Sequence, residues 1–267
     1  MTRRTAFAGL LFVSLCLVLT FLTLPIVAIF TDTSPGDLVN SLGEQGALDA
    51  LWLSLKTSLA ALVIIVVVGT PAAYLLATRD FRGRSVMMTL IELPLVLPPA
   101  VAGIALLAAF GPKGIFGSAL EDAGITLVLQ TAGVIVALTF VAAPFYLRQA
   151  QEAFAAVDRN LLDAARTLGA SEARAFGRVA IPCAGQGLTA GMALAWGRAL
   201  GEFGATLMFA GSFPGITQTV PLAIFARFST DFTSALALSA VLVIVSAALL
   251  LSVKLLGRAP FLGGGQA

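Results

Sequence analysis

The stretch DAARTLGASEARAFGRVAIP, residues 163–182, is a charged, amphipathic segment that lies between long apolar runs. Its apolar positions, among them Leu168 and Phe176, are interspersed with arginines and acidic residues, as on a helix that lies at a surface. Gly169 interrupts the stretch and a proline closes it. We therefore expect two short helices, broken near Gly169 and ended at Pro182.

On both sides of this stretch the sequence consists of runs long enough to cross a membrane. Of 267 residues, 58% are hydrophobic and 11% are charged, whereas an ordinary soluble domain has about 25% charged residues. A helix needs about 20 apolar residues to cross a bilayer, and continuous rather than alternating runs exclude a membrane barrel. We predict an all-α, polytopic membrane protein, a single transmembrane domain over 1–267, with six spans at about 6–30, 52–78, 87–110, 125–147, 186–211 and 234–256.

The basic residues favour one orientation of these spans. With the N-terminus in the cytoplasm, 12 of the 16 lysines and arginines fall in cytoplasmic segments and 3 fall outside. Cytoplasmic loops of membrane proteins carry such an excess. We therefore expect a multi-pass protein of the cell inner membrane with both termini cytoplasmic, in which residues 148–185 form the one long cytoplasmic loop.

The composition argues against several classes of function. The chain has no histidine and two cysteines, so we expect no catalytic residue and no metal site. A net charge of +2 without a dense basic patch argues against nucleic acid as a partner. The chain contains no GxxxxGK[ST] phosphate loop. We expect that the protein is not an enzyme and binds no cofactor itself.

The stretch 163–182 resembles the signature loop of binding-protein-dependent ABC permeases. That pattern has an acidic residue and two alanines, then a glycine, then an aliphatic-x-aliphatic-proline sequence. The matching residues are Asp163, Ala164, Ala165, Gly169, Val179, Ile181 and Pro182. The family's first residue is usually glutamate, so Asp163 is a mild departure within intact spacing. The resemblance implies the type I ABC importer permease fold and a loop, 148–185, that couples to a separate ATPase subunit.

The residue types in this motif suit docking on a partner. Small side chains at Ala164, Ala165, Gly169 and Ala170 let two backbones approach closely, and a glycine permits a turn that other residues resist. The alternative is an ordinary amphipathic surface helix without a partner. The motif lies in the one long loop that the charges place in the cytoplasm, and this favours docking.

Two further stretches resemble permeases of the molybdate and sulfate uptake systems: ELPLVLPPAVAGIALL at 92–107 and GRALGEFGATLMFAG at 197–211. The first, with the connection at 111–125, looks closer to molybdate permeases. The resemblance implies import of molybdate, from which tungstate is hard to separate because the two anions have nearly the same size and charge. It also implies a homodimer, two ATP-binding cassette ATPase subunits that use ATP, and a periplasmic or lipoprotein oxyanion-binding protein.

Two other classes of transporter remain open. A sulfate or thiosulfate permease often pairs two different membrane subunits, so neighbouring genes for one permease or two would distinguish it. A secondary transporter needs intramembrane carboxylates and often has inverted repeats. Only Glu92 and Glu202 are candidates here, and no repeat is evident. Uptake that follows an ion gradient and not ATP would identify that class.

Two ionisable residues inside the predicted fifth span are candidates for the translocation pathway. Arg198 and Glu202 are four residues apart, share one helix face, and can form an ion pair. Ionisable groups inside a membrane usually face a bundle interior or a wet cavity. One interpretation is a structural pair with Glu92 as a further partner; the other places Arg198 on the oxyanion path.

Three prolines lie in the predicted third span, at Pro94, Pro98 and Pro99. Proline removes a backbone hydrogen bond and bends or breaks a helix, and neighbouring helices or water must then satisfy the freed carbonyls. We expect either a hinge or pore-lining irregularity of the kind that alternating access needs, or a static kink.

Overall fold

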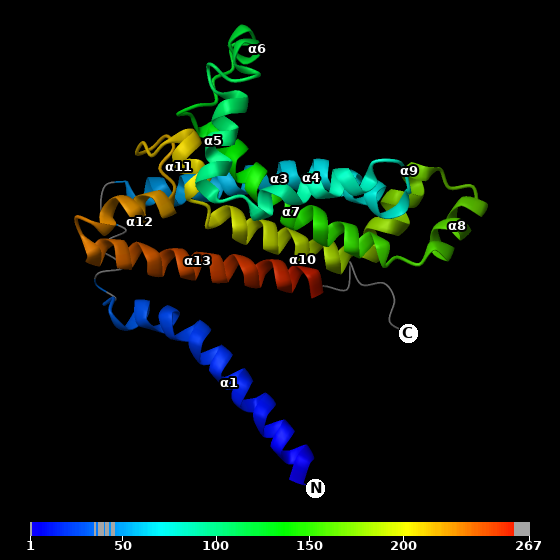
Figure 1. The fold of residues 1–267 in the computed structure, drawn as a ribbon, viewed down its shortest axis with the longest axis horizontal. Coiled ribbons are helices and arrows are strands. Elements are labelled where there is room, and N and C mark those ends of the chain that lie inside the picture. Colours follow the sequence, from blue (N-terminus) through cyan, green and yellow to red (C-terminus); the bar gives the residue numbers. More distant parts are fainter. Residues whose placement is uncertain (1, 35, 37–39, 41–42, 44–45, 259–267) are drawn as a thin grey trace.

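The computed structural model describes residues 2–34, 36, 40, 43 and 46–258, and within them every regular element is helical (Figure 1). Five helices are long and apolar enough to cross a membrane, or up to six if one sharply bent pair counts as a single span. The prediction of an all-α polytopic membrane protein is confirmed. The helices near the expected first, second and sixth spans are α1 (Thr2–Thr31), α3 (Ala47–Thr78) and α13 (Phe232–Arg258).

A bundle of roughly parallel and antiparallel helices forms the body of the molecule. At its centre α3 packs against α7 (Thr131–Ala155), and α7 packs against α10 (Ile181–Leu200), while α13 covers α10 and the short α12 (Val220–Phe228). Small residues allow these close contacts. Close packing matters here because the hydrophobic effect does not favour the association of helices in lipid. The buried core includes Ala61, Ala142, Ala150, Ala184 and Ala195.

One close approach in this core is made at a glycine. A Cβ on Gly69 of α3 would lie 3.1 Å from the ring of Tyr146 on α7. The hydroxyl of the next residue, Thr70, lies 2.6 Å from the Tyr146 hydroxyl. The pair satisfies two polar groups inside the bundle and aligns α3 with α7.

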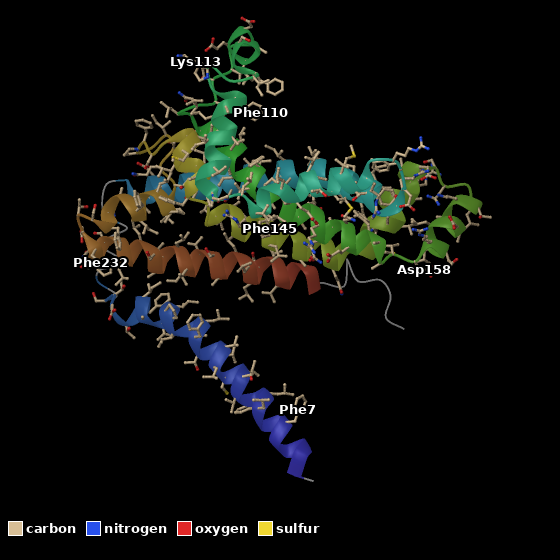
Figure 2. All side chains as sticks on the ribbon, viewed as in Figure 1. Phe7, Phe110, Lys113, Phe145, Asp158 and Phe232 are labelled. Carbon is tan, nitrogen blue, oxygen red and sulfur yellow. The ribbon has the colours of Figure 1, made fainter. Side chains whose placement is uncertain are left out.

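Helix α1 stands away from the bundle. Its membrane-length segment, Phe7–Thr31, has none of its most apolar window buried, and its large apolar side chains, such as Phe7, project on all sides (Figure 2). Only its C-terminal part approaches α13 (Figure 1). A helix that is apolar all round requires lipid or another protein surface around it.

The span predicted over 87–110 consists of two helices in the structure. The segment forms α4 (Arg84–Val96) and α5 (Pro99–Phe110), whose axes differ in direction by 119°. Pro98 and Pro99 cause the break, because a residue before proline is excluded from the helical region, and the ψ angles of Leu97 and Pro98 are 131° and 136°. The prolines act as the sequence predicted, but they produce a corner rather than a bent crossing.

The predicted fifth span, 186–211, is also interrupted. Helix α10 ends at Leu200, and a separate helix, α11 (Gly204–Ala210), follows after a short break. Helices α5 and α11 then cross at very short range. A Cβ on Gly103 would lie 2.6 Å from the Cβ of Met208 and 2.7 Å from the Ala205 carbonyl oxygen.

The segment predicted as a long loop over 148–185 is largely helical in the structure. Helix α7 continues to Ala155, so the fourth span begins and ends later than the predicted 125–147. Helices α8 (Arg159–Thr167) and α9 (Glu172–Ala175) lie within the loop, and a π-helical turn (Phe176–Ala180) runs directly into α10. Residues Glu172–Leu200 therefore form one helical span of 29 residues.

The expectation that Pro182 ends a helix is accordingly wrong. Pro182 lies in the first turn of α10. The amide of Ile181 donates to the carbonyl of Phe176, five residues earlier, instead of four. In a regular α-helix the proline ring would clash with the carbonyl four residues before it, and the wider π turn relieves that clash.

Candidate functional site

Helix α8 projects with α9 at one end of the bundle (Figure 1). Asp158, which directly precedes α8, marks the same end in Figure 2. Asp158 caps the helix, because its Oδ1 accepts a hydrogen bond from the Asn160 amide at 2.9 Å. Leu162 is buried in the main core cluster, and Ala165 is partly buried against it. These two side chains fasten α8 to the bundle.

The opposite side of α8 carries exposed apolar and small side chains. Leu161, Ala164 and Leu168 follow the i, i+3, i+7 spacing of one helix face, and Leu168 is 88% exposed. We call these three residues the docking face. The helix is packed on the bundle on one side and exposes this apolar face on the other. Such a face is suited to insertion in a groove of a second protein.

Gly169 ends α8 in the left-handed conformation, with φ at +86°. Its amide donates to the Arg166 carbonyl at 2.9 Å, and the amide of Ala170 donates to the Ala165 carbonyl at 3.0 Å. A left-handed residue after a helix commonly closes the last turn in this way. The break near Gly169 is confirmed, and it turns the chain back toward the bundle.

The second half of the motif is part of the bundle instead of the docking face. Val179 lies in the π turn, and Ile181 begins α10. Both side chains are partly buried against the main core cluster. Residues 163–170 therefore present the surface, while Val179, Ile181 and Pro182 connect it to a membrane-length helix.

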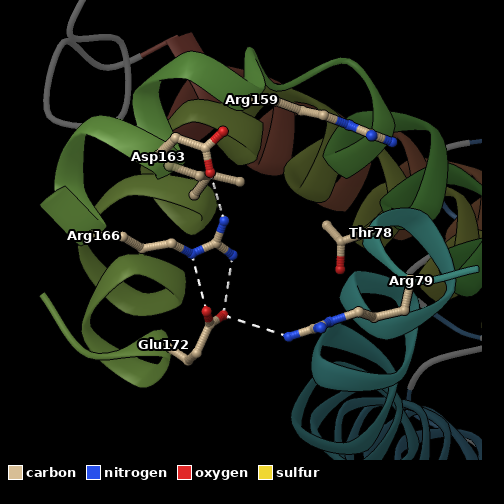
Figure 3. A pocket seen from close by; sticks show the side chains of 7 residues that line it. Thr78, Arg79, Arg159, Asp163, Arg166 and Glu172 are labelled. Atoms are coloured by element: carbon tan, nitrogen blue, oxygen red, sulfur yellow. Dashed lines mark hydrogen bonds and ion pairs between the residues drawn. The ribbon is translucent and has the colours of Figure 1, made fainter.

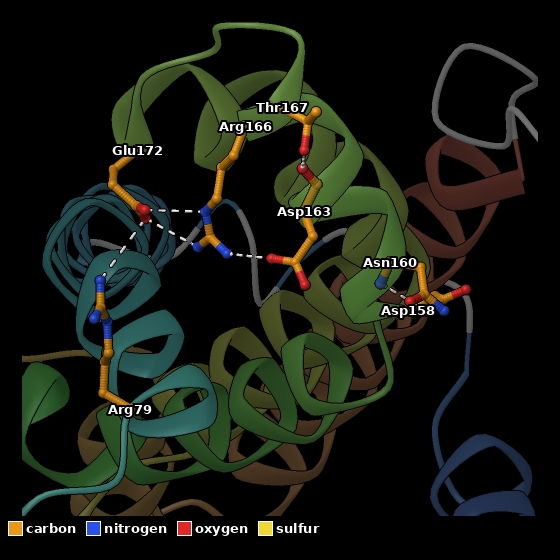
Figure 4. Close-up of polar contacts among 7 residues, drawn as sticks. All are labelled: Arg79, Asp158, Asn160, Asp163, Arg166, Thr167 and Glu172. Carbon is orange, nitrogen blue, oxygen red and sulfur yellow. Dashed lines mark hydrogen bonds and ion pairs between the residues drawn. The ribbon is translucent and has the colours of Figure 1, made fainter.

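A network of charged residues surrounds the inner side of α8 (Figure 4). Arg166 contacts Asp163 at 2.8 Å and Glu172 of α9 at 2.9 Å, and Glu172 also lies 3.8 Å from Arg79 at the end of α3. Hydrogen bonds to Glu172 and, secondarily, to Asp163 raise the pKa of Arg166 above its ordinary value. The family-like acidic residue Asp163 is thus engaged within the chain.

A cavity of about 340 Å³ lies beside this network, between α8 and the end of α3 (Figure 3). Arg79, Arg159 and Arg166 line it with Asp163 and Glu172. Sequence reasoning singled out Asp163 but not Arg79 or Glu172. No local pattern could connect those two, because they lie on different elements far apart in the chain.

The predicted ion pair inside the membrane-length bundle is confirmed. Arg198 Nη2 lies 2.5 Å from Glu202 Oε2. Glu202 is 1% exposed, and its Oε1 accepts a hydrogen bond from the Ala205 amide at 2.7 Å. Glu202 therefore caps α11 from the break after α10, rather than sharing a face of one continuous helix with Arg198 as expected.

Glu92 is not a further partner of that pair. It lies on α4 and contacts Arg148 of α7 at 3.8 Å, while Arg148 also contacts Glu152 at 3.5 Å. Pro94 follows within the same helix, α4, and does not break it. The structure thus separates the candidate pathway residues into an α4–α7 contact and the α10–α11 break.

Comparison with known proteins gives several matches over most of the chain. Residues 66–259 match the family model of the binding-protein-dependent transport system inner membrane component. The molybdenum transport system permease protein ModB of Mycobacterium tuberculosis is 43% identical over 87% of this chain and 88% of that protein. A probable transport system permease protein, NifC of Clostridium pasteurianum, is 37% identical over 88% of this chain and 82% of the relative.

Solved structures share the fold at low sequence identity. A chain of a bacterial alginate ABC transporter, in complex with an alginate pentasaccharide-bound periplasmic protein, has a TM-score of 0.76 at 16% identity. The match covers 99% of this chain and 98% of that chain. The helices described above are therefore arranged as in that chain.

Proposed function

The chain belongs to the family of binding-protein-dependent transport system inner membrane components, and from this premise we propose that it is the membrane-spanning subunit of an ATP-driven importer of molybdate. Tungstate is a second cargo under this proposal because of its matching size and charge. The observation that supports it most strongly is the docking face on α8, displayed beyond the bundle in a chain with molybdenum permease relatives.

We propose that two copies of the chain form the pathway. The described residues of one chain supply up to six spans, and most of the apolar surface of α1 has no cover from its own bundle. Two ATPase subunits engage the two α8 helices and use ATP, while this chain binds no cofactor. An external oxyanion-binding protein delivers the cargo to the opposite end of the bundle.

The proposed orientation places the α8 end in the cytoplasm, with both termini on the same side. Arg79 and Arg82 precede α4 at this end, Arg84 begins α4, and Arg159 and Arg166 lie on α8. This accumulation of positive charge at one end of the helices matches the bias of cytoplasmic loops.

Coupling would proceed through rigid packing. The docking face occupies a groove on the ATPase, and Leu162 and Ala165 pass the movement of α8 into the core cluster. The same polypeptide continues through the π turn into α10 without a flexible linker. ATP-driven approach of two such helices would then rotate the two bundles relative to each other.

For the pathway itself we propose a role for Arg198. Its side chain is 27% exposed, while Glu202 holds it in place from below the surface. A partly exposed cation attracts an oxyanion, and its pairing with a carboxylate keeps that attraction weak enough for release. Glu92 with Pro94 would support the α4–α7 contact, and Pro98 with Pro99 would set the corner beside the pathway.

Replacement of Gly169 by alanine is expected to lower oxyanion uptake while the protein remains folded. Nothing lies within 4 Å of the Cβ position, so the effect is conformational. The left-handed backbone costs a residue with a Cβ about 1–2 kcal/mol. Relief of that strain would displace the end of α8. Co-purification of the ATPase and uptake should both decrease, and Gly169→Asn should retain more of each because asparagine adopts this conformation more readily.

The proposed function is tested by the cellular content of molybdenum and sulfur. Strains with and without the gene are grown on trace molybdate with sulfate in excess. Loss of molybdenum, with sulfur unchanged, is the expected result. Restoration by the wild-type gene but not by Gly169→Val separates transport from an indirect effect of the deletion.

Other outcomes would replace the assignment of the cargo or of the energy source. A fall in sulfur identifies a sulfate or thiosulfate permease. Unchanged molybdenum and sulfur would contradict import of either anion. Uptake into vesicles that follows an ion gradient, without the ATPase subunit and ATP, would identify a secondary transporter.

A further inference from the structure

Charged side chains connect α8, the helix that carries the docking face, to the central helix α3. Arg166 of α8 contacts Glu172 of α9, and Glu172 contacts Arg79. Arg79 directly follows the last residue of α3. This line of contacts, visible in Figure 4, leads from the docking helix to the helix at the centre of the bundle.

The space between these two elements is not filled by side chains. The cavity of about 340 Å³ has Thr78 and Arg79 on one side, and Arg159, Asp163 and Arg166 on the side of α8 (Figure 3). Leu162 fastens only the inner surface of α8 to the core. The Arg79–Glu172 ion pair therefore bridges the two sides of the cavity where apolar packing does not.

Resting on the proposed function, we propose that Arg79 is a positioning residue for energy coupling. Through Glu172 and Arg166 it holds α8 at a defined distance from the end of α3. A displacement of α8 by the ATPase then moves α3 directly. We call this series of contacts, from Arg79 through Glu172 to Arg166, the tie. Without it, α8 can move into the cavity, and part of its displacement does not reach the membrane-spanning helices.

The contribution of this tie to stability is small. Side chains in the network are between 37% and 68% exposed, and exposed ion pairs add little to folding stability and weaken in salt. Loss of Arg79 should therefore leave a folded protein that still binds the ATPase. This combination separates a positioning role from a general structural one.

The first experiment measures molybdate imported per ATP hydrolysed by the complete complex in proteoliposomes. Arg79→Gln is expected to lower this ratio at least threefold with ATPase stoichiometry unchanged, and Arg79→Lys should restore it. Arg82→Gln is the matched control, since Arg82 lies in the same turn and pairs with no described acidic residue. Equal ratios for Arg79→Gln and Arg82→Gln would overturn the proposal.

A pair of variants tests the route of the tie. Glu172→Gln should lower the ratio at least as much as Arg79→Gln does, because it removes the contacts with both Arg79 and Arg166. The double variant should be no worse than Glu172→Gln alone, because Arg79 acts only through Glu172. Additive losses would show that the two residues act separately, which contradicts the proposal.

A second experiment does not depend on the cargo. Spin labels at Leu75 on α3 and Asn160 on α8, with Cys16 and Cys183 replaced by serine, report the distance between the two helices in the full chain in nanodiscs. Arg79→Gln should broaden the distance distribution, and Arg82→Gln should not. Unchanged widths would refute the positioning role. If the wild-type complex imports no oxyanion, the proposed function fails, and this measurement still decides whether Arg79 positions α8.

Discussion

Replacement of Glu202 by leucine should destabilise the protein by about 3–5 kcal/mol, the range observed when one partner of a buried ion pair is removed. Glu202 is 1% exposed and contacts both the Arg198 guanidinium and the Ala205 amide. Leucine would leave the Arg198 charge uncompensated inside the membrane and the first turn of α11 uncapped. The free energy of unfolding, from denaturant titration in mixed micelles, measures the effect.

Two further variants show which interaction matters. Glu202→Gln keeps an acceptor for the Ala205 amide but loses the charge, so it should recover only part of the stability. Arg198→Met combined with Glu202→Leu removes both charges and should be more stable than Glu202→Leu alone. A double variant as unstable as Glu202→Leu would contradict the ion-pair explanation.

A second double variant, Arg198→Met with Glu202→Gln, keeps an acceptor for the Ala205 amide and distinguishes the two interpretations of Arg198. If the pair only locks the α10–α11 break, the folded double variant should import molybdate at a rate close to that of the wild type. If Arg198 attracts the oxyanion, as proposed, uptake should fall about tenfold or more despite correct folding. Uptake in cells normalised to the amount of membrane-inserted protein separates the two.

Replacement of Gly103 by alanine should disrupt the α5–α11 crossing. The added Cβ would lie 2.6 Å from the Met208 Cβ and 2.7 Å from the Ala205 carbonyl oxygen, and backbone cannot move as a flexible side chain does. Overpacking of this kind costs about 1–3 kcal/mol. Helices α5 and α11 each follow a helix break that carries candidate pathway residues. If alanine pushes α5 away from α11, molybdate uptake should therefore also fall, by about tenfold.

The matched control is Gly197→Ala. Gly197 lies on α10, where an added Cβ would meet only Leu250 Cδ2 at 3.9 Å, an ordinary contact distance. Alanine also favours a helix by up to about 1 kcal/mol over glycine. Uptake and thermal stability should therefore stay at or above wild-type values. Equal losses in the two variants would show that any alanine in these glycine-rich segments is harmful, against the close-crossing explanation.

The motif at residues 163–182 shows how much of the structure the local sequence predicts. The resemblance of residues 163–182 to a family motif predicted a docking loop, and Gly169 does interrupt the helix in the left-handed conformation. Which residues of the motif are exposed and which pack against the core could not be predicted. Whether Val179 and Ile181 face a partner or the core depends on the path of α10, which only the packing of the bundle sets.

Prolines illustrate the same limit inside the spans. Pro25, Pro71, Pro94 and Pro144 all lie within helices, whereas Pro98 and Pro99 mark a break of 119°. Neighbouring helices can satisfy the carbonyl freed by a single proline. A proline alone therefore does not say whether a span continues, bends or turns a corner.

The sequence by itself determined the helical, membrane-spanning class, the approximate places of the spans, the helix break at Gly169 and the pairing of Arg198 with Glu202. These properties depend on the length of apolar runs and on the spacing of nearby residues. The tertiary structure alone decided the breaks before α5 and α11, the contact of Glu92 with Arg148, and the tie from Arg79 to Glu172. Those features join residues distant in the chain, and their energies depend on which surfaces the folded bundle brings together.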